Sequence, residues 1–363
     1  MRQSAAMPEI ERPSRLTRYL LVAYIALVAY ATLYPLTGWR DPGPGALAFL
    51  AAPLPRYVTS FDLAVNFLAY VPLGLLAVAA LRPPLSVRAA MVVAALAIFL
   101  MSLGLEALQS YLPARIPSNL DLAINTAGAL GGAVAAILLE RRLGGRRAWR
   151  TVRDTLFQEG HTTDAGLVLL ALWLVSQLNP ETLLFGAGDL RELFAAPTTQ
   201  AYPPALFVRV EALVAGANLF AVALLARLLV SPGPRALVFV LSLIAAALAV
   251  RSIAFGILFS PRDAFAWATP GALIGLGTGL SLALFALRLP RSLSVALAGL
   301  ALMAATTVVN IAPENPYLTQ SLSEWRQGHF LNLNGLTRIV SAAWPFAAVF
   351  YLTLAARGRE APA

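Results

Sequence analysis

Ten runs of mostly apolar residues, each about twenty residues long, alternate with short polar segments along the chain. A helix needs about 20 apolar residues to cross the hydrocarbon core of a bilayer, so each run predicts a transmembrane helix. The predicted spans lie near residues 19–36, 62–80, 87–110, 119–139, 165–183, 206–229, 236–259, 266–287, 293–311 and 337–356. No small-residue cleavage site follows the first run, which predicts an uncleaved helix rather than a signal peptide. We therefore expect an all-α, polytopic integral membrane protein.

The placement of arginine predicts the orientation of these spans. Basic residues concentrate in cytoplasmic loops, and an N-terminus on the inside puts eighteen of the 27 arginines on the inner side. An even number of spans then leaves both termini cytoplasmic. The densest basic stretch begins at Arg141 with RRLGGRRAWR. We take residues 141–164 as a cytoplasmic connector between a four-helix domain, residues 18–140, and a six-helix domain, residues 165–356.

Composition excludes several classes of protein. The chain is 59% hydrophobic and only 12% charged, whereas about a quarter of the residues of a typical soluble domain are charged. This composition excludes a soluble globular domain. The formal charge of +9 comes from arginine without any lysine, and no aromatic-basic motif of a nucleic-acid binder accompanies it. The chain has no cysteine and two distant histidines, His161 and His329, which disfavours a metal site. No nucleotide-binding motif is present, and we expect no cofactor.

Polar residues interrupt two neighbouring spans near residues 102–132. Glu106 and Gln109 are three residues apart near the end of one predicted helix and therefore share a face. Asp121 and Asn125 lie on one stripe of the next. A carboxylate in hydrocarbon is costly without a partner, so these residues predict a functional site. Arg115, in the loop between the two helices, is the predicted partner of Glu106, with Asp121 in the same cluster.

The second predicted span carries a similar stripe. Asp62, Asn66 and Tyr70 are spaced by four residues. Pro72 removes a backbone donor and bends a helix, which would favour an outward-facing cavity. Alternatively, Asp62 only stabilises the first turn through the helix dipole.

Structural explanations also exist for the two carboxylates of the hairpin. Asp121 follows Ser118 and Asn119, either of which suits an N-cap. Glu106 lies towards the C-terminal end of its helix, where the dipole disfavours an anion. A purely structural role for Glu106 would therefore need a salt bridge to Arg115 or a proton.

These residues, in this order, resemble the signature of the VanZ-like membrane family over about residues 18–140. The matching positions are Asn66, Pro72, Gly74, Glu106, Gln109, Arg115, Asp121, Asn125, Gly128 and Gly132. Many members carry two adjacent acids where this chain has Leu120 before a single Asp121. The resemblance implies a polytopic protein in a family linked to glycopeptide antibiotic resistance, without a settled biochemical activity. For Gly128 and Gly132, close packing of a neighbouring helix is the simpler interpretation.

The C-terminal half carries fewer signals. Arg251, towards one end of its span, is expected either to snorkel to the interface or to pair with Glu211. Residues 218–221 and 271–275 faintly resemble residues 66–69 and 128–132, which suggests a degenerate repeat. Two long outer loops, 180–204 and 312–337, would roof the site or lie on the membrane, the second as an interfacial helix.

Three classes of function remain open. In the first, an envelope-facing site in the bacterial cytoplasmic membrane binds or modifies the head group of a membrane lipid or envelope glycolipid. Glu106 and Asp121 would then form the acid–base pair of any reaction. The other two are a small-molecule or lipid transporter and a non-catalytic membrane scaffold. The residues decide neither whether the chain is an enzyme nor its oligomeric state. The expected ligand-binding residues are Asp62, Asn66, Gln109, Arg115 and Asn125.

Overall fold

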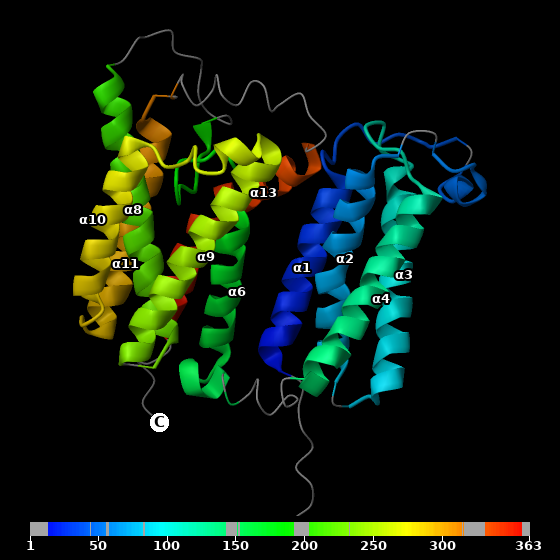
Figure 1. Cartoon of the computed structure of the whole chain (residues 1–363), viewed down its shortest axis with the longest axis horizontal. Helices are drawn as coiled ribbons and strands as arrows, with labels where there is room; N and C mark the ends of the chain where they lie inside the picture. Colours follow the sequence, from blue (N-terminus) through cyan, green and yellow to red (C-terminus); the bar gives the residue numbers. More distant parts are fainter. Residues whose placement is uncertain are drawn as a thin grey trace, which may run out of the picture. The chain divides into compact units, whose positions relative to one another are not determined.

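The protein is all-α, as expected. The computed structural model describes residues 14–43, 45–55, 58–82, 84–142, 151, 153–191, 203–231, 233–313, 315 and 331–357. Its α-helices (Figure 1) are α1 (Arg15–Leu33), α2 (Ser60–Leu81), α3 (Val87–Gln109), α4 (Asn119–Arg142), α6 (His161–Ser176), α8 (Pro204–Leu229), α9 (Pro234–Leu258), α10 (Pro270–Ala286), α11 (Arg291–Ile311) and α13 (Leu331–Arg357). Two short 3-10 helices, η1 (Ala48–Ala51) and η2 (Pro261–Asp263), lie between them.

Eight of the described helices are long and apolar enough to cross a membrane, so the chain is a multi-pass membrane protein. The other two predicted spans correspond to α6 and α10, which have 16 and 17 residues. A 16-residue helix is about 24 Å long, less than the roughly 30 Å of the hydrocarbon core. Ten crossings and their orientation therefore stay a prediction.

Reporter fusions separate ten crossings from eight. With ten crossings, a reporter after Arg142 and one after Arg235 should both be cytoplasmic, and one after Pro313 extracytoplasmic. If α6 and α10 do not cross, α8 runs outward, and the reporter after Arg235 moves to the outside. Paired alkaline phosphatase and green fluorescent protein fusions measure this, because each is active on one side only. A cytoplasmic signal after Pro313 contradicts both models.

The chain divides into two compact units, Met1–Thr151 and Val152–Ala363, which we call unit 1 and unit 2. The division falls inside the predicted connector 141–164, of which residues 143–150 and 152 lie outside the described residues. The domain bounds expected from the sequence stay a prediction.

In unit 1, α2 packs against α4 with its backbone in direct contact, because both helices present glycine there. A Cβ atom on Gly128 would lie 2.2 Å from the carbonyl oxygen of Phe67, and one on Gly132 would lie 1.9 Å from that of Val71. The contact is mutual, since a Cβ on Gly74 would lie 1.9 Å from the carbonyl oxygen of Ala129. The packing interpretation of these glycines is confirmed.

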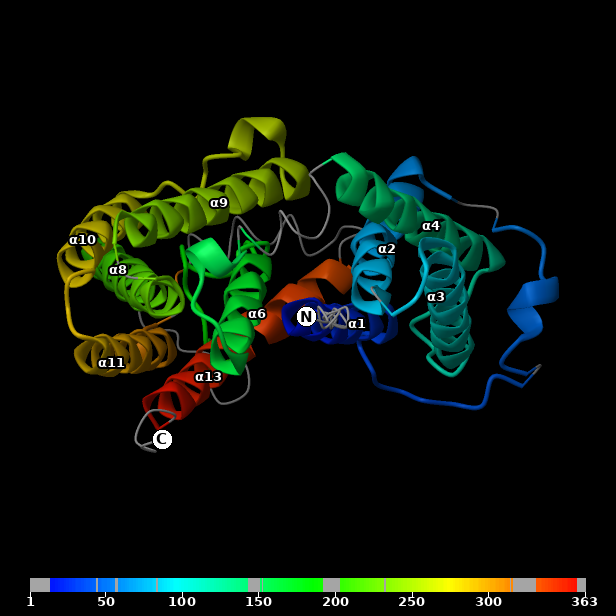
Figure 2. The same ribbon diagram turned by 90° about the horizontal axis from the view of Figure 1, so that it is seen from below.

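The segment between α1 and α2 runs out past α3 and past the loop that joins α3 to α4 (Figure 2). Backbone and side-chain hydrogen bonds attach it to that loop: Arg40 N to Tyr111 O at 2.9 Å, and Ser110 Oγ to Ala46 O at 3.0 Å. Asn119 Nδ2 at the start of α4 also donates to a carbonyl of this segment. The segment therefore lies over the end of unit 1 at which α3 ends and α4 begins.

In unit 2, α8 is the most buried of the candidate spans. Both α10 and α11 pack against it, and α10 approaches through Gly275 and Gly279. A Cβ atom on Gly271 would meet the backbone of Val208, ten positions before Asn218. In unit 1, Gly128 instead meets Phe67, next to Asn66. The faint sequence repeat is therefore not reproduced in the register of the helix pairs.

Candidate functional site

Polar side chains from α2, α3 and α4 meet inside unit 1. Asn66 on α2 donates from Nδ2 to Asp121 Oδ1 on α4 at 3.0 Å. Asn125, one turn further along α4, donates from Nδ2 to Ser102 Oγ on α3 at 3.0 Å. The spacing of four residues between Asp121 and Asn125 thus turns both side chains towards neighbouring helices. We call this group the polar cluster; its residues are Asn66, Tyr70, Ser102, Glu106, Asp121 and Asn125.

Ser118 is the N-cap of α4, one of the two residues expected. Its Oγ accepts hydrogen bonds from the backbone N–H groups of Leu120 and Asp121 at 3.2 and 3.3 Å. Its own N–H donates to Glu106 Oε2 at 2.9 Å. In a capping box, the third helical residue makes this last bond. Here that residue is Asp121, which faces Asn66, and Glu106 supplies the acceptor from another helix.

Arg115 does not pair with Glu106, and the predicted salt bridge is wrong for the described residues. The guanidinium donates to the carbonyls of Tyr34 at 2.7 Å and Ala31 at 3.1 Å, at the end of α1. The last carbonyls of a helix lack partners within it, and these two are met by Arg115. Burial lowers the pKa of Arg115, while the charge of Glu106 acts against that shift. Gln109 likewise donates to α1, to the carbonyl of Thr32 at 2.8 Å.

Asp62 lies at the exposed start of α2 and forms a capping box with Thr59. Its Oδ2 accepts from Thr59 Oγ1 at 2.6 Å, and its backbone N–H donates to the same hydroxyl at 3.1 Å. These bonds support the simpler interpretation of Asp62. A role for Asp62 in binding stays a prediction.

Two buried atoms of the polar cluster have no hydrogen-bond partner: the hydroxyl of Tyr70 and Oδ1 of Asn125. Tyr70 is 3% exposed and Asn125 is 4% exposed. The Tyr70 hydroxyl lies near Ser102 and Thr32 without forming a hydrogen bond of normal geometry. Buried polar atoms are rarely left unsatisfied. The cluster therefore contains two buried atoms without any partner: a hydroxyl that can donate and accept, and an amide oxygen that can only accept.

The part of the chain that carries the polar cluster matches a known family. Residues 21–140 match the VanZ/LLP1 family model. This VanZ-like segment contains all of α2, α3 and the polar cluster, and it confirms the resemblance seen in the sequence. No curated protein and no solved structure matches the chain. The site residues of the VanZ-like segment are therefore assigned from their geometry in this chain.

Unit 2 contains a second polar region, which the sequence pattern divided between the end of the predicted span 165–183 and the predicted outer loop 180–204; the helix prediction was wrong for residues 177–183. Residues 177–190, after α6, are not helical, yet Gln177 and Asn179 are 1% and 2% exposed. Phe185 is fully buried with a positive φ of 57°, which is uncommon for a bulky residue. Irregular backbone at membrane depth is tolerated where protein buries it. We call residues 177–190 the buried segment.

Arg251 of α9 fixes the buried segment. It is 2% exposed and donates from Nη1 to the carbonyl of Asn179 and from Nη2 to that of Thr182. Nη1 also lies 3.2 Å from Thr182 Oγ1. The guanidinium therefore does not snorkel, and the described residues include no ion pair between Arg251 and Glu211. Neither expectation for Arg251 holds, because backbone carbonyls are its partners.

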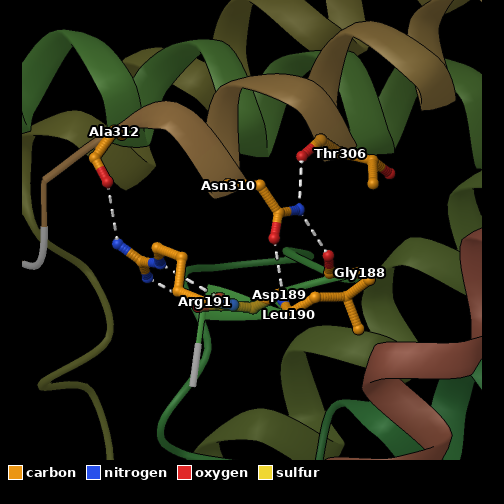
Figure 3. A network of polar contacts seen from close by, with 7 residues as sticks. All are labelled: Gly188, Asp189, Leu190, Arg191, Thr306, Asn310 and Ala312. Atoms are coloured by element: carbon orange, nitrogen blue, oxygen red, sulfur yellow. Dashed lines mark hydrogen bonds and ion pairs between the residues drawn. The ribbon is translucent and has the colours of Figure 1, made fainter. Parts of the chain in front are cut away.

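Asn310 holds the far end of the buried segment from α11 (Figure 3). Its Nδ2 donates to Gly188 O at 2.7 Å and to Thr306 O at 2.8 Å, and its Oδ1 accepts from Leu190 N at 2.8 Å. All three bonds use the amide of one side chain. The amide therefore joins α11 to residues more than 100 positions earlier in the chain.

Arg191 follows directly and contacts Asp189 through two hydrogen bonds, of 3.0 and 2.6 Å (Figure 3). It also donates to Ala312 O at 3.1 Å. Residues 180–191 of the predicted outer loop thus pack within unit 2, whereas 192–202 and most of 312–337 lie outside the described residues. A hollow beside this network is lined by Glu181, Thr182, Asp189, Arg191, Phe207 and Val309, among others.

The hydrogen bond between Glu106 and Ser118 gives a prediction for stability. The amide oxygen of Glu106→Gln still accepts from Ser118 N, so we expect its unfolding temperature in detergent to stay near that of the wild type. Glu106→Leu leaves the Ser118 N–H without an acceptor, which costs about 1–3 kcal/mol. Thermal unfolding followed by size-exclusion chromatography compares the two. Equal stability of Glu106→Leu and Glu106→Gln would refute the capping role.

Proposed function

We propose that the VanZ-like segment binds the head group of an envelope lipid or glycolipid in the polar cluster, at the extracytoplasmic end of α3. The observation that supports this most is the pair of buried, unpartnered atoms on Tyr70 and Asn125. In a membrane domain such atoms cost several kcal/mol each, and a ligand that bonds to both offsets that cost. The orientation rests on the arginine distribution.

Chemical modification of the head group is the stronger form of this proposal. Glu106 and Asp121 would be the acid and the base. Each accepts one hydrogen bond, from Ser118 N and Asn66 Nδ2 respectively, which leaves a second oxygen on each carboxyl for a ligand. A link to glycopeptide antibiotic resistance follows from the VanZ resemblance and belongs to this proposal. The proposed location is the bacterial cytoplasmic membrane.

Co-purifying lipids test the binding. Asn125→Leu removes the free acceptor while keeping a side chain of similar size, and we expect it to lose about nine-tenths of the lipid that accompanies the purified wild type. Asn218→Leu is the matched control, because Asn218 is also a fully buried helical asparagine with an unpartnered Oδ1, in unit 2. Quantitative lipid mass spectrometry measures both. Identical lipid content in the wild type and Asn125→Leu refutes the proposal.

The effect of variants on the cell envelope distinguishes a site that acts on a ligand from one that only stabilises the fold. If the polar cluster acts on its ligand, Glu106→Gln should abolish the envelope phenotype at unchanged stability, because the amide hydrogen-bonds but transfers no proton. A scaffold without a ligand would tolerate both Glu106→Gln and Asn125→Leu.

Transport of a lipid or small molecule is the second candidate. Two observations favour it: Pro72 lies inside α2, two residues from Tyr70, and unit 2 contains the non-helical buried segment. Interrupted helices and irregular segments form the binding sites of many transporters. Movement of fluorescent lipid between leaflets of vesicles that contain the full chain tests this candidate.

A further inference from the structure

The hydrogen-bond balance of the polar cluster indicates which head group it accepts. Glu106 uses Oε2 for Ser118 N, and Asp121 uses Oδ1 for Asn66 Nδ2. Within the described part of the chain, no group donates to Glu106 Oε1 or Asp121 Oδ2. Asn125 Oδ1 is a further acceptor without a partner. Glu106, Asp121 and Asn125 therefore each carry an oxygen that accepts no hydrogen bond.

Donors are fewer, and most are already engaged. The amide nitrogens of Asn66 and Asn125 each donate within the cluster. Arg115, the cation of the hairpin loop, donates to two carbonyls at the end of α1, and Gln109 also donates to α1. Among the described residues of the cluster, two buried hydroxyls donate to no acceptor: that of Tyr70, which has no partner at all, and that of Ser102, which only accepts, from Asn125 Nδ2.

This balance disfavours an anionic group. A phosphate would meet two carboxyl groups while the nearest guanidinium is bound to backbone, and like charges repel more strongly as the dielectric constant falls. An ammonium group would satisfy the acceptors, the Tyr70 oxygen among them, but it would leave the O–H donors of Tyr70 and Ser102 without an acceptor. A hydroxyl group both donates and accepts, so it matches Asn125 Oδ1 and the Tyr70 hydroxyl together.

We infer that the polar cluster recognises an uncharged, hydroxyl-bearing head group, such as a sugar or glycerol, with Asn125 Oδ1 and the Tyr70 hydroxyl as its hydrogen-bond partners. This inference rests on the proposed function and specifies its ligand. Ser102 is close to both partners: its Oγ accepts from Asn125 Nδ2 and lies near the Tyr70 hydroxyl. The two partners are thus grouped on one side of α3.

The test compares lipids that differ only in head group. The full chain is released from dodecyldimethylamine oxide, which accepts but does not donate hydrogen bonds, and is titrated in native mass spectrometry with four dioleoyl lipids. These are glucosyl-diacylglycerol with hydroxyls, phosphatidylethanolamine with ammonium, phosphatidylcholine without donors, and phosphatidic acid. We expect the glucosyl lipid to bind at least ten-fold more tightly than the other three.

The preference for the glucosyl lipid should fall about ten-fold in Asn125→Leu and in Tyr70→Phe, and stay unchanged in Asn218→Leu. Tyr70→Phe removes only one hydroxyl, so the lipid preference of this variant is compared with that of the wild type if Asn125→Leu does not fold. A preference for phosphatidic acid or phosphatidylethanolamine that depends on Asn125 would keep the proposed site and overturn the hydroxyl inference. Equal binding of all four lipids to the wild type and both variants would overturn the proposed function together with the inference.

Discussion

Gly132→Ala should destabilise unit 1 by about 3 kcal/mol or more, at the upper end of the cost of overpacking. The added Cβ would lie 1.9 Å from the carbonyl oxygen of Val71, and a backbone atom cannot turn away as a side chain can. The helices α2 and α4 would have to separate along their contact, which would also stretch the hydrogen bond between Asn66 and Asp121. Thermal unfolding in detergent, followed by size-exclusion chromatography, measures the loss.

Gly104→Ala is the matched control, because a Cβ at Gly104 in α3 has no atom within 4 Å. Alanine is favoured over glycine in a helix by about 1 kcal/mol, so this variant should be as stable as the wild type or slightly more stable. A Gly132→Ala protein as stable as Gly104→Ala would show that α2 and α4 do not pack as described.

Arg251→Met should destabilise unit 2 by about 2–6 kcal/mol, because it leaves two buried carbonyls without a donor at about 1–3 kcal/mol each. Methionine fills a similar length but donates nothing, so the carbonyls of Asn179 and Thr182 lose their donor in the interior. Arg251→Lys should be intermediate, because an ammonium lacks the planar fork that reaches two acceptors.

Arg262→Met is the control for Arg251→Met, since Arg262 lies exposed in η2, and we expect a change within about 0.5 kcal/mol. Limited proteolysis after Phe185 gives a second measurement, because loss of the Arg251 contacts should expose the buried segment. An Arg251→Met protein that is as stable and as protease-resistant as Arg262→Met would contradict the role assigned to Arg251.

The apolar pattern predicted where the ten α-helices of the described residues lie, because length and hydropathy are properties of each segment alone. Ser118 as N-cap and the packing role of Gly128 and Gly132 were predictable for the same reason: capping acts within one turn, and small residues act at one surface. The spacing placed Glu106 on a polar face of its helix, and the structure buries this side chain. Its partner was not predicted, because Arg115 reaches carbonyls of α1, and no spacing within the hairpin encodes where α1 packs.

The buried segment shows a different limit. Its amides, acids and glycines give no helical period, and such residues usually indicate an exposed loop. Its burial depends on Arg251 and Asn310, which follow it by about 70 and 120 positions. An arginine in an apolar span marks Arg251 as unusual and favours either the interface or a charged partner, whereas its partners are carbonyl groups that every residue carries.

The backbone contact between α2 and α4 also restricts how unit 1 can move. Glycines on both helices bring main chain against main chain, so neither helix can rotate or slide without a steric clash, and the pair moves as one body. The contacts of this pair with α1 and α3 are made by side chains instead: Tyr24 of α1 donates to the carbonyl of Ala69, and Asn125 donates to Ser102 of α3. A change of side-chain rotamer is enough to break such contacts. A separation of helices within unit 1 would therefore occur at α1 or at α3 and would leave the α2–α4 pair intact.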